Sequence, residues 1–274
     1  MKRVVHSKLG GLDIGLVRTG GCGLANCMFF ATRGLIFAND NGLRFLRPTW
    51  ERFGIGPIIR REKDKRFYFG LFKGWLSLDN FYKCFRLLFR RNVVCLSGWW
   101  NYGTDMITNW DLVRNYFFSN INEAAICKVP YRFKNTIALH IRRGDMPDVD
   151  TISTEWSYRM LKLVLAEAPN ANVLLFSDGN DDELKEFLDM PNVTRAFYGN
   201  AIADIVAISR CQVVIGTYST FSWWGAYLSQ APYVAYIKRN AGCCHKDSTK
   251  YCEMGDSGDF PVAFRNHIRI ALNA

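Results

Sequence analysis

The sequence lacks any long apolar run. The most apolar stretch near the N-terminus, residues 23–38, is interrupted by Asn26, Thr32 and Arg33. It falls short of the roughly 18 uninterrupted apolar residues that a membrane-spanning helix needs. The basic start of the chain is not followed by the apolar core of a signal peptide. We therefore expect a cytoplasmic protein, or a catalytic domain from which an anchor has been removed.

Regular cysteine spacing is also missing. Nine cysteines are scattered through 274 residues, an odd number in a chain much longer than disulfide scaffolds, which favours a reducing compartment. The one dense cluster contains Cys243, Cys244, His245 and Cys252, and it fits no standard zinc spacing. Free thiols are therefore favoured over metal ligands, and we expect no metal site.

Acidic residues are too few to balance the basic ones, so the formal net charge is +10. This charge suits nucleic acid, an anionic membrane or phosphorylated ligands. The basic residues cluster in the first half, but no zinc finger, basic zipper or RNA-binding signature accompanies them, which places nucleic acid last. Residues 67–91 interleave aromatics with Lys and Arg, as in an interfacial helix. A core-facing helix with snorkelling basic side chains is the favoured alternative.

From residue 136 onward, short apolar runs alternate with helical patterns. The predicted strands are 136–141, 172–178, 193–199, 212–219 and 233–238, and the predicted helices are 154–168, capped by Thr154, 181–190, 203–211 and 221–230. This alternation predicts an α/β fold with a parallel, Rossmann-like sheet and right-handed crossovers. Residues 12–46 open the first half as another strand, glycine loop, helix and strand. We predict two lobes facing a cleft, residues 1–130 and 131–274, with the chain passing between them within 128–135.

The run Ile137–Leu139 has no polar alternation, as expected of a parallel strand covered on both faces, and it ends in His140, Arg142, Arg143 and Asp145. Ligands of parallel α/β sheets bind at the carboxyl ends of the strands. Paired arginines there favour a phosphate or carboxylate ligand, because guanidinium groups are planar, bidentate and always charged. A surface ion pair between arginine and aspartate is the alternative.

Other predicted turns carry polar groups toward the same edge. Four hydroxyls surround the helix start near residue 220, on Thr217, Ser219, Thr220 and Ser222. Unpaired N–H groups make a helix N-terminus a phosphate site, whereas simple N-capping would explain only one hydroxyl. Asp178 follows a strand and could accept two N–H bonds from a purine such as guanine, or cap the next helix. The glycine loop 20–29 lacks both G-x-G-x-x-G and a Walker lysine, but its backbone amides could hold a pyrophosphate opposite the arginines.

Taken in order, the motifs GGCGLANCMF (20–29), LSGWWNY (96–102), HIRRGD (140–145), LLFSD (174–178) and STFSWW (219–224) resemble the α-1,2-fucosyltransferase family. The resemblance implies a two-lobed GT-B fold, GDP-fucose as donor, inversion at the anomeric carbon, and no metal or other cofactor. It also implies contacts with the donor from three groups of residues. Arg142 and Arg143, with His140 beside them, bind the diphosphate; Ser219, Thr220 and Phe221 line the β-phosphate and fucose; Asp178 lies near the guanine, and Gly23 and Asn26 face the donor from the first lobe.

The chain departs from the family pattern at two places. Cys22, Ala25 and Cys27 stand where the family usually has Gly, Gly and Gln, and Gly179 stands where a second Asp is common. The first set of exchanges puts the contacts between loop 20–29 and the donor in question. The exchange at Gly179 does the same for the contact with the guanine base.

The chemistry requires a stabilised leaving group and a base. Arg142, Arg143 and the helix start at Ser219 would neutralise the departing diphosphate in place of a metal. In the related α-1,6-fucosyltransferases the base lies ten residues after the motif histidine, which here is Asp150, while Asp145 would orient an arginine. A solvated loop carboxylate is the alternative for Asp148 and Asp150.

The sequence thus predicts transfer of fucose from GDP-fucose to a hydroxyl of a glycan acceptor, α-1,2 to galactose, on a surface polysaccharide or lipid-linked oligosaccharide. A lipid-linked acceptor would suit a basic, aromatic first lobe that contacts an anionic membrane peripherally. Two rivals stay open: the same fold using another GDP-sugar, and a non-catalytic relative that binds a glycan or nucleotide.

Overall fold

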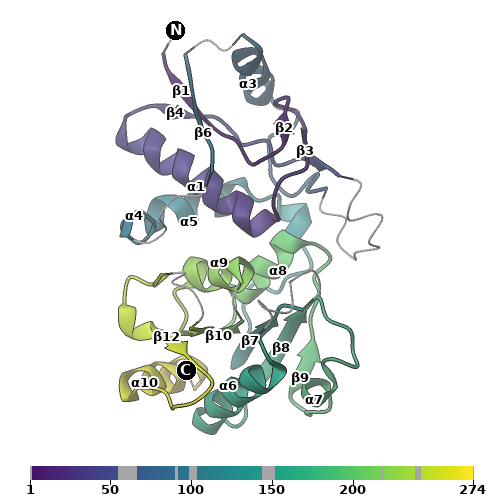
Figure 1. Cartoon of the computed structure of the whole chain (residues 1–274), viewed down its shortest axis with the longest axis vertical. Helices are drawn as coiled ribbons and strands as arrows, with labels where there is room; N and C mark the ends of the chain where they lie inside the picture. Colours follow the sequence, from purple (N-terminus) through teal and green to yellow (C-terminus); the bar gives the residue numbers. More distant parts are fainter. Residues whose placement is uncertain are drawn as a thin grey trace. The chain divides into compact units, whose positions relative to one another are not determined.

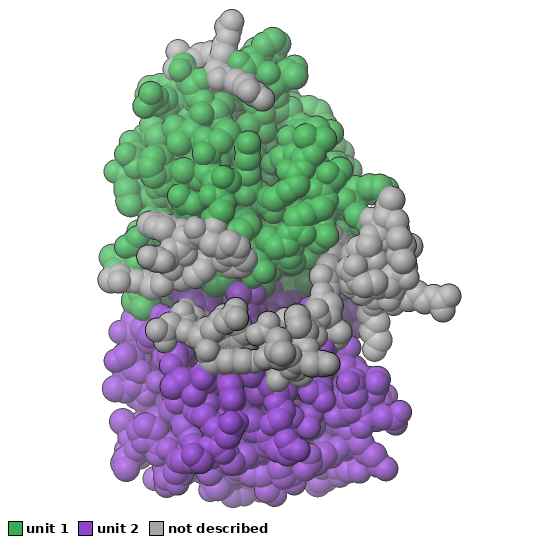
Figure 2. All heavy atoms as spheres, in the orientation of Figure 1, with its two compact units in different colours: residues 1–127, 200–202 green, residues 128–199, 203–274 purple. Residues whose placement is uncertain are grey.

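The computed structural model describes residues 2–54, 67–89, 92–98, 104–143, 152–217, 219–237 and 242–273. These residues form two compact units, which are distinguished by colour in Figure 2. Unit 1 contains residues 1–127 and 200–202, and unit 2 contains residues 128–199 and 203–274. Each unit is built on a parallel sheet, so the predicted α/β fold class is confirmed.

The main sheet of unit 1 has the order β4-β1-β6, with all strands parallel. Its strands are β1 (Val4–Ser7), β4 (Arg44–Phe45) and β6 (Val93–Leu96). Helix α1 (Leu24–Asp40) packs on this sheet (Figure 1). Gly34 allows the close crossing, since a Cβ there would lie 2.0 Å from Ser7 Oγ.

The strand predicted to begin at Leu12 is not part of that sheet. Instead, β2 (Leu12–Asp13) pairs antiparallel with β3 (Arg18–Thr19), which pairs with β5 (Arg52–Phe53) in a separate small sheet. Glycines with positive φ break the chain on both sides of β2, at Gly11 (71°) and Gly15 (89°). The sheet strand is the fully buried β1 just before them, which sequence reasoning missed.

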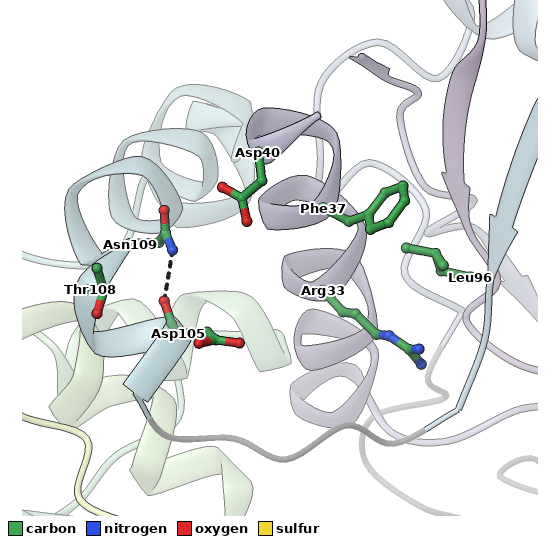
Figure 3. A pocket seen from close by; sticks show the side chains of 7 residues that line it. All are labelled: Arg33, Phe37, Asp40, Leu96, Asp105, Thr108 and Asn109. Atoms are coloured by element: carbon green, nitrogen blue, oxygen red, sulfur yellow. Dashed lines mark hydrogen bonds between the residues drawn. The ribbon is translucent and has the colours of Figure 1, made fainter. Parts of the chain in front are cut away.

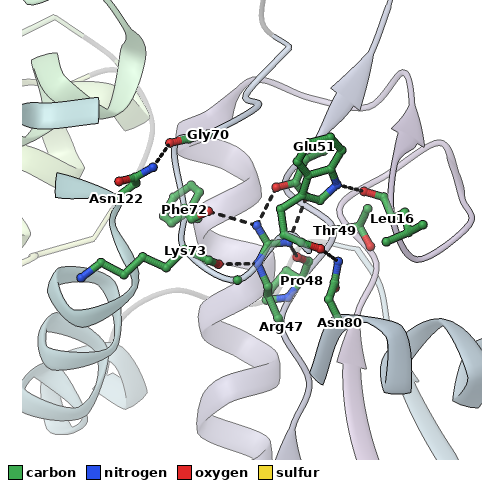
Figure 4. A network of polar contacts seen from close by, with 12 residues as sticks. Leu16, Arg47, Pro48, Thr49, Glu51, Gly70, Phe72, Lys73, Asn80 and Asn122 are labelled. Atoms are coloured by element: carbon green, nitrogen blue, oxygen red, sulfur yellow. Dashed lines mark hydrogen bonds and ion pairs between the residues drawn. The ribbon is translucent and has the colours of Figure 1, made fainter. Parts of the chain in front are cut away.

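Buried charged residues hold unit 1 together. The carboxylate of Glu51, which is fully buried, accepts two hydrogen bonds from the Arg47 guanidinium at 2.6 and 2.9 Å. Arg47 also donates from Nε to the carbonyl of Lys73 at 2.7 Å, as Figure 4 shows. The loop after β4 is therefore tied to the segment around Phe72, whose ring stacks on Trp50 with centroids 4.1 Å apart.

The remaining helices of unit 1 are α3 (Leu78–Leu88), α4 (Thr104–Thr108), α5 (Trp110–Asn120) and the 3-10 turn Glu123–Ile126. Helix α3 is inverted relative to an ordinary amphipathic helix. Its buried residues are Asn80, Lys83 and Arg86, whereas the apolar side chains of this segment face outward. The favoured prediction for residues 67–91, a core-facing helix with basic side chains reaching water, is therefore wrong. Burial of the two cations is tolerated because both are paired: Lys83 Nζ donates to Thr49 Oγ1 at 3.1 Å, and Arg86 donates to the carbonyls of Lys2 and Asn92.

Unit 2 contains a six-stranded parallel sheet with the order β12-β11-β10-β7-β8-β9. Its strands are β7 (Thr136–Ile141), β8 (Asn172–Ser177), β9 (Val193–Arg195), β10 (Val213–Gly216), β11 (Tyr233–Tyr236) and β12 (Tyr251–Met254). Its helices are α6 (Thr154–Glu167), α7 (Lys185–Leu188), α9 (Thr220–Ser229) and α10 (Val262–Leu272), with a 3-10 turn at Ser248–Lys250. Helix α8 (Ala201–Ile208) also belongs to unit 2, apart from its first two residues, which are grouped with unit 1. Read from β9 to β12, this is the doubly wound order 3-2-1-4-5-6.

Helices cover both faces of this sheet (Figure 1). Helices α6 and α10 pack on one face in a core that includes Ile137, Leu139 and Ile215, while α8 and α9 lie on the other. Two details of the prediction are corrected. The cap of α6 is Ser153, whose side chain accepts from the N–H of Trp156, and the helix expected over 181–190 is reduced to the four residues of α7. Among the described residues, no helix is both long and apolar enough to cross a membrane.

Candidate functional site

The sheet of unit 2 reverses its winding between β7 and β10. In this order, the strands after β7 are added on one side as β8 and β9, and on the other as β10, β11 and β12. In sheets of this order, ligands generally bind at the carboxyl ends of the two strands where the winding reverses. The segments that follow β7 and β10 carry the arginine pair and the hydroxyl-rich helix start predicted from the sequence.

Backbone hydrogen bonds fix the position of the arginine pair. The N–H of Arg142 donates to Thr217 Oγ1 at 3.0 Å, and the N–H of Arg143 donates to Asp178 Oδ1 at 2.8 Å. The N–H of Thr217 in turn donates to the carbonyl of His140 at 3.1 Å. The ends of β7, β8 and β10 are thus joined, and the structure brings together Arg142, Arg143, Asp178 and Thr217.

Asp178 binds the arginine segment through both carboxylate oxygens. Its Oδ2 lies 2.7 Å from Nη1 of Arg142, and both side chains are about 30% exposed, at 31% and 28%. This ion pair is the alternative that the sequence left open. The predicted contact between Asp178 and guanine has to coexist with this pairing.

Arg143 is held less completely than Arg142. Its Nη1 lies 3.5 Å from the carbonyl of Ile152, and its Nε lies 3.9 Å from Glu183 Oε1. The buried Nε has no hydrogen-bond partner among the residues that the structure describes. A buried donor without a partner is costly, and an anionic ligand would satisfy it. Sequence reasoning missed Glu183, because it falls in a segment that was predicted to be an ordinary helix.

His140 is buried and packs against the start of α9. Its ring stacks on Phe221, with centroids 5.3 Å apart and an interplanar angle of 23°. Burial, followed by the charge of Arg142, lowers the pKa of His140 to about 4. The imidazole is therefore neutral near pH 7, and its buried Nδ1 has no hydrogen-bond partner within the described part of the chain. His140 can offer a polar nitrogen to a ligand but adds no positive charge.

The hydroxyls around the start of α9 have separate roles. Ser219 is the N-cap, and its Oγ accepts from the N–H of Phe221 at 3.2 Å. Thr217 holds the arginine loop, as described above. Ser222 is buried and donates to the carbonyl of Ser219 at 3.2 Å, and its Oγ would lie 2.2 Å from a Cβ at Gly216. At least three of the four hydroxyls are used in the fold, so their number was not evidence for a phosphate site. The helix start itself remains that evidence.

Gly179 matches its surroundings. A Cβ at this position would lie 3.2 Å from both Arg143 Cγ and Glu183 Oε2, and 3.3 Å from Ser177 Oγ. The exchange of the family's second aspartate for glycine therefore makes room for the Arg143 side chain. The two tryptophans of STFSWW are core residues, since both are buried and Trp223 stacks on Tyr227 at 5.0 Å.

Other predicted site residues lie in unit 1 or outside the described residues. Gly23 is the N-cap of α1, and Asn26 is half-buried in the first turn of that helix. Asp145, Asp148 and Asp150 lie outside the described residues, so the choice of base stays a prediction. Within the ranges that the structure covers, no group of three or more His, Cys, Asp or Glu side chains could hold a metal ion.

Unit 1 has a cavity of about 440 Å³ of its own (Figure 3). It is lined by α1, the end of β6 and α4, through Arg33, Phe37, Asp40, Leu96, Asp105, Thr108 and Asn109. Arg33 donates to the carbonyl of Ser97 at 2.7 Å, and Asn109 donates to that of Asp105 at 2.9 Å. The lining combines carboxylates, an amide, a hydroxyl and an aromatic ring, the groups that bind sugar hydroxyls and sugar rings.

Comparison with known proteins identifies a family. The model of glycosyl transferase family 11 matches residues 78–251, more than half of the chain. The O-antigen biosynthesis glycosyltransferase WbnK of Escherichia coli is 25% identical over 156 residues, which cover 51% of this chain and 52% of that protein. The chain thus spans about half the length of this curated relative.

Solved structures show a distant likeness. A crystal structure of NodZ alpha-1,6-fucosyltransferase soaked with GDP-fucose covers 86% of this chain and 96% of its own, at 14% identity and a TM-score of 0.48. A structure of fucosyltransferase NodZ from Bradyrhizobium covers 85% and 94%, at 15% identity and a TM-score of 0.46.

Proposed function

Because this chain belongs to glycosyl transferase family 11, we propose that it transfers fucose from GDP-fucose to a hydroxyl of a glycan, with inversion and without a metal ion. The family membership confirms the resemblance at the family level. The observation that supports the donor proposal is the arginine pair at the reversal point of the sheet, fixed through backbone N–H groups beside the start of α9.

The proposed chemistry is displacement at the anomeric carbon. The acceptor oxygen attacks that carbon while the bond to the β-phosphate oxygen of GDP breaks, and the acceptor proton passes to a base. Negative charge then grows on the leaving diphosphate. Arg142, Arg143 and the positive end of α9 at Ser219–Phe221 stabilise this charge, which is the role that a metal ion has in other transferases. Asp150 is the proposed base, and Asp145 is proposed to orient an arginine.

Thermal-shift measurements with GDP, UDP, ADP and CMP test the donor. We expect GDP alone to raise the melting temperature, and Arg143→Ala to abolish that response. The matched control is Arg269→Ala, which removes a surface arginine of α10 paired with Glu167 and should leave the GDP response intact. A protein that does not respond to GDP would not be a GDP-sugar transferase.

Donor hydrolysis separates the remaining alternatives. Release of GDP from GDP-fucose distinguishes an enzyme from a non-catalytic relative, and comparison with other GDP-sugars identifies the sugar. Turnover that survives EDTA supports the metal-free mechanism, whereas turnover that EDTA stops would overturn it. The anomeric configuration of the product then reports inversion or retention.

The acceptor is proposed to be a galactose-containing glycan, joined α-1,2, of a surface polysaccharide or lipid-linked oligosaccharide. The name of the E. coli relative, which concerns O-antigen biosynthesis, supports this class. The cavity of unit 1 in Figure 3 is the proposed place for an acceptor sugar. Asp105→Asn should then raise the acceptor KM with little change in donor hydrolysis, when measured against a panel of short β-galactosides. An unchanged KM would remove this cavity from the proposal.

Peripheral contact with an anionic membrane belongs to the same proposal. The outward face of α3 and the residue after it consists of five exposed apolar side chains, Leu78, Phe81, Phe85, Leu88 and Phe89. Residues 1–127 contain 19 Lys and Arg against 9 Asp and Glu, whereas residues 128–274 contain 16 of each. The whole net charge of +10 therefore lies in the segment that contains this apolar face. An exposed apolar helix face in a segment of net positive charge matches an interface of anionic lipid headgroups.

Vesicle sedimentation tests the membrane contact. We expect binding to vesicles containing phosphatidylglycerol and little binding to pure phosphatidylcholine. F81D/F85D should abolish it, while Phe197→Asp, at an exposed aromatic of unit 2, should not. Equal vesicle binding by the wild-type protein and by F81D/F85D would overturn the membrane proposal. So would a dimer in solution that F81D/F85D dissociates.

A further inference from the structure

Two of the departures from the family pattern contact each other. Cys22 and Cys27 replace a Gly and a Gln of the first loop, and their sulfur atoms lie 3.6 Å apart. Gly23 is the N-cap of α1, so Cys22 is the residue before the cap and Cys27 is the fourth helical residue. Side chains at these two positions meet across the start of a helix. The fold therefore brings two thiols together within a segment of six residues.

The surroundings of the pair are basic. Arg18, which is fully buried, donates from Nη2 to Cys27 Sγ at 3.2 Å, and Arg52 Nη1 lies 3.5 Å from the Cys22 carbonyl. The backbone N–H groups at the start of α1 add partial positive charge. The hydrogen bond from Cys27 lowers the pKa of Cys22 to about 7, with further lowering by Arg18 and Arg52 against the effect of burial. The pKa of the buried Cys27 thiol is raised.

The two cysteines also differ in access. Cys22 is half-buried, whereas Cys27 is fully buried. An accessible thiolate beside a protected, protonated thiol is the arrangement of an attacking and a resolving cysteine. Closure to a disulfide requires the sulfurs to approach from 3.6 Å to about 2 Å.

We propose that Cys22 and Cys27 form a redox-active dithiol that hydroperoxides oxidise to an intramolecular disulfide. The Cys22 thiolate attacks the peroxide, the O–O bond breaks, and Cys22 becomes a sulfenic acid while hydroxide or an alkoxide leaves and takes a proton from water. The Cys27 sulfur then attacks Cys22, an S–S bond forms, and the sulfenic oxygen leaves as water with the proton of Cys27. Two electrons pass from the thiols to the peroxide.

The disulfide would enclose Gly23 and Asn26, the two residues of this loop that are predicted to face the donor. We expect oxidation to change transfer activity and dithiothreitol to reverse the change; this expectation rests on the proposed function. The chemical modification itself does not depend on that function, so the two can fail separately.

Peptide mapping tests the modification. The reduced protein is treated with stoichiometric hydrogen peroxide, alkylated with iodoacetamide and digested with trypsin. Cleavage after Arg18 and Arg33 places both cysteines, and no other, in the peptide 19–33. We expect the mass of this peptide to fall by two hydrogen atoms and the peptide to resist alkylation. Its oxidation should be about tenfold faster than that of the exposed Cys95 and Cys127.

Single variants separate a dithiol from a merely structural contact. Cys27→Ser should leave a Cys22 sulfenic acid that dimedone traps, and Cys22→Ser should leave Cys27 reduced. If the pair only packs the start of the helix, these variants will change stability, and the peptide will be alkylated at both positions after peroxide. That result, or oxidation no faster than at Cys95 and Cys127, would overturn the proposal.

Discussion

Charged side chains have opposite places in the two units. In unit 1, Arg18, Glu51 and Lys83 are fully buried and bind other parts of the fold. In unit 2, Arg142 and Arg143 lie partly exposed at strand ends, and the fully buried side chains described there include no Lys, Arg, Asp or Glu. The comparison shows that the charge of an arginine alone does not indicate whether the residue stabilises the fold or binds a ligand. Burial makes it structural, and exposure at the carboxyl edge of a parallel sheet leaves it available to a ligand.

The strongest test of this comparison is Glu51→Ala. The variant would leave the largely buried Arg47 guanidinium without its counter-charge. We therefore expect the free energy of unfolding to fall by about 3–5 kcal/mol. Urea titration followed by tryptophan fluorescence measures it. In unit 2, Asp259→Ala removes a solvent-exposed partner of Arg265 and should change stability by about 0.5 kcal/mol or less. Equal losses at the two sites would contradict the comparison.

Acid should weaken unit 2 before unit 1. Burial lowers the pKa of His140 and of His245 to about 4, so between pH 6.5 and 4 the unfolded chain binds protons that the folded unit does not. Stability therefore falls as the pH falls through this window, by up to about 3 kcal/mol for each histidine. In unit 1, burial would raise the pKa of Asp13, but the hydrogen bond and charge of His6 lower it, so that contribution is lost only below about pH 4.

Hydrogen exchange with mass spectrometry at pH 7, 5.5 and 4.5 resolves the two units. We expect protection in β7 and β10 to fall first, and His245→Gln to reduce the pH dependence. Protection that stays constant between pH 6.5 and 4.5 would contradict this order.

Asp178→Asn tests how the arginine pair is positioned. The variant weakens the ion pair with Arg142, and we expect kcat to fall about ten- to a hundredfold, because small displacements of charge-stabilising groups are costly. The melting temperature should barely change. If Asp178 instead binds guanine, the variant will lose its preference for GDP over inosine diphosphate, which lacks the 2-amino group, while turnover persists.

Gly179→Ala should have a smaller effect on turnover than Asp178→Asn. Its Cβ would press on Arg143 at 3.2 Å, so we expect about 1 kcal/mol of destabilisation and a several-fold loss of turnover. The control is Gly255→Ala, whose nearest atom would be at an ordinary 3.5 Å. Turnover unchanged in both variants would show that the space around Arg143 is not tight.

Much of unit 2 could be predicted from the sequence, because its buried strands are continuous apolar runs. The strands β7, β8, β10 and β11 lie within their predicted ranges, and parallel topology then places their carboxyl ends together. The sequence could not show how Asp178 divides its two oxygens between neighbouring residues, since this depends on the register between β7 and β8.

Unit 1 was less predictable for a physical reason. Its main strands are only two to four residues long, too short for a periodic signal, and its helix α3 reverses the usual pattern. A buried lysine such as Lys83 looks the same in sequence as an exposed one. The contact between Cys22 and Cys27 was equally hidden, because it depends on which residue caps α1.

The hydrogen bonds that fix Arg142 and Arg143 begin at main-chain nitrogens, not at the guanidinium groups. Every amino acid except proline brings the same N–H to these positions. Substitution of either arginine therefore changes the side chain that the end of β7 presents and keeps these two hydrogen bonds.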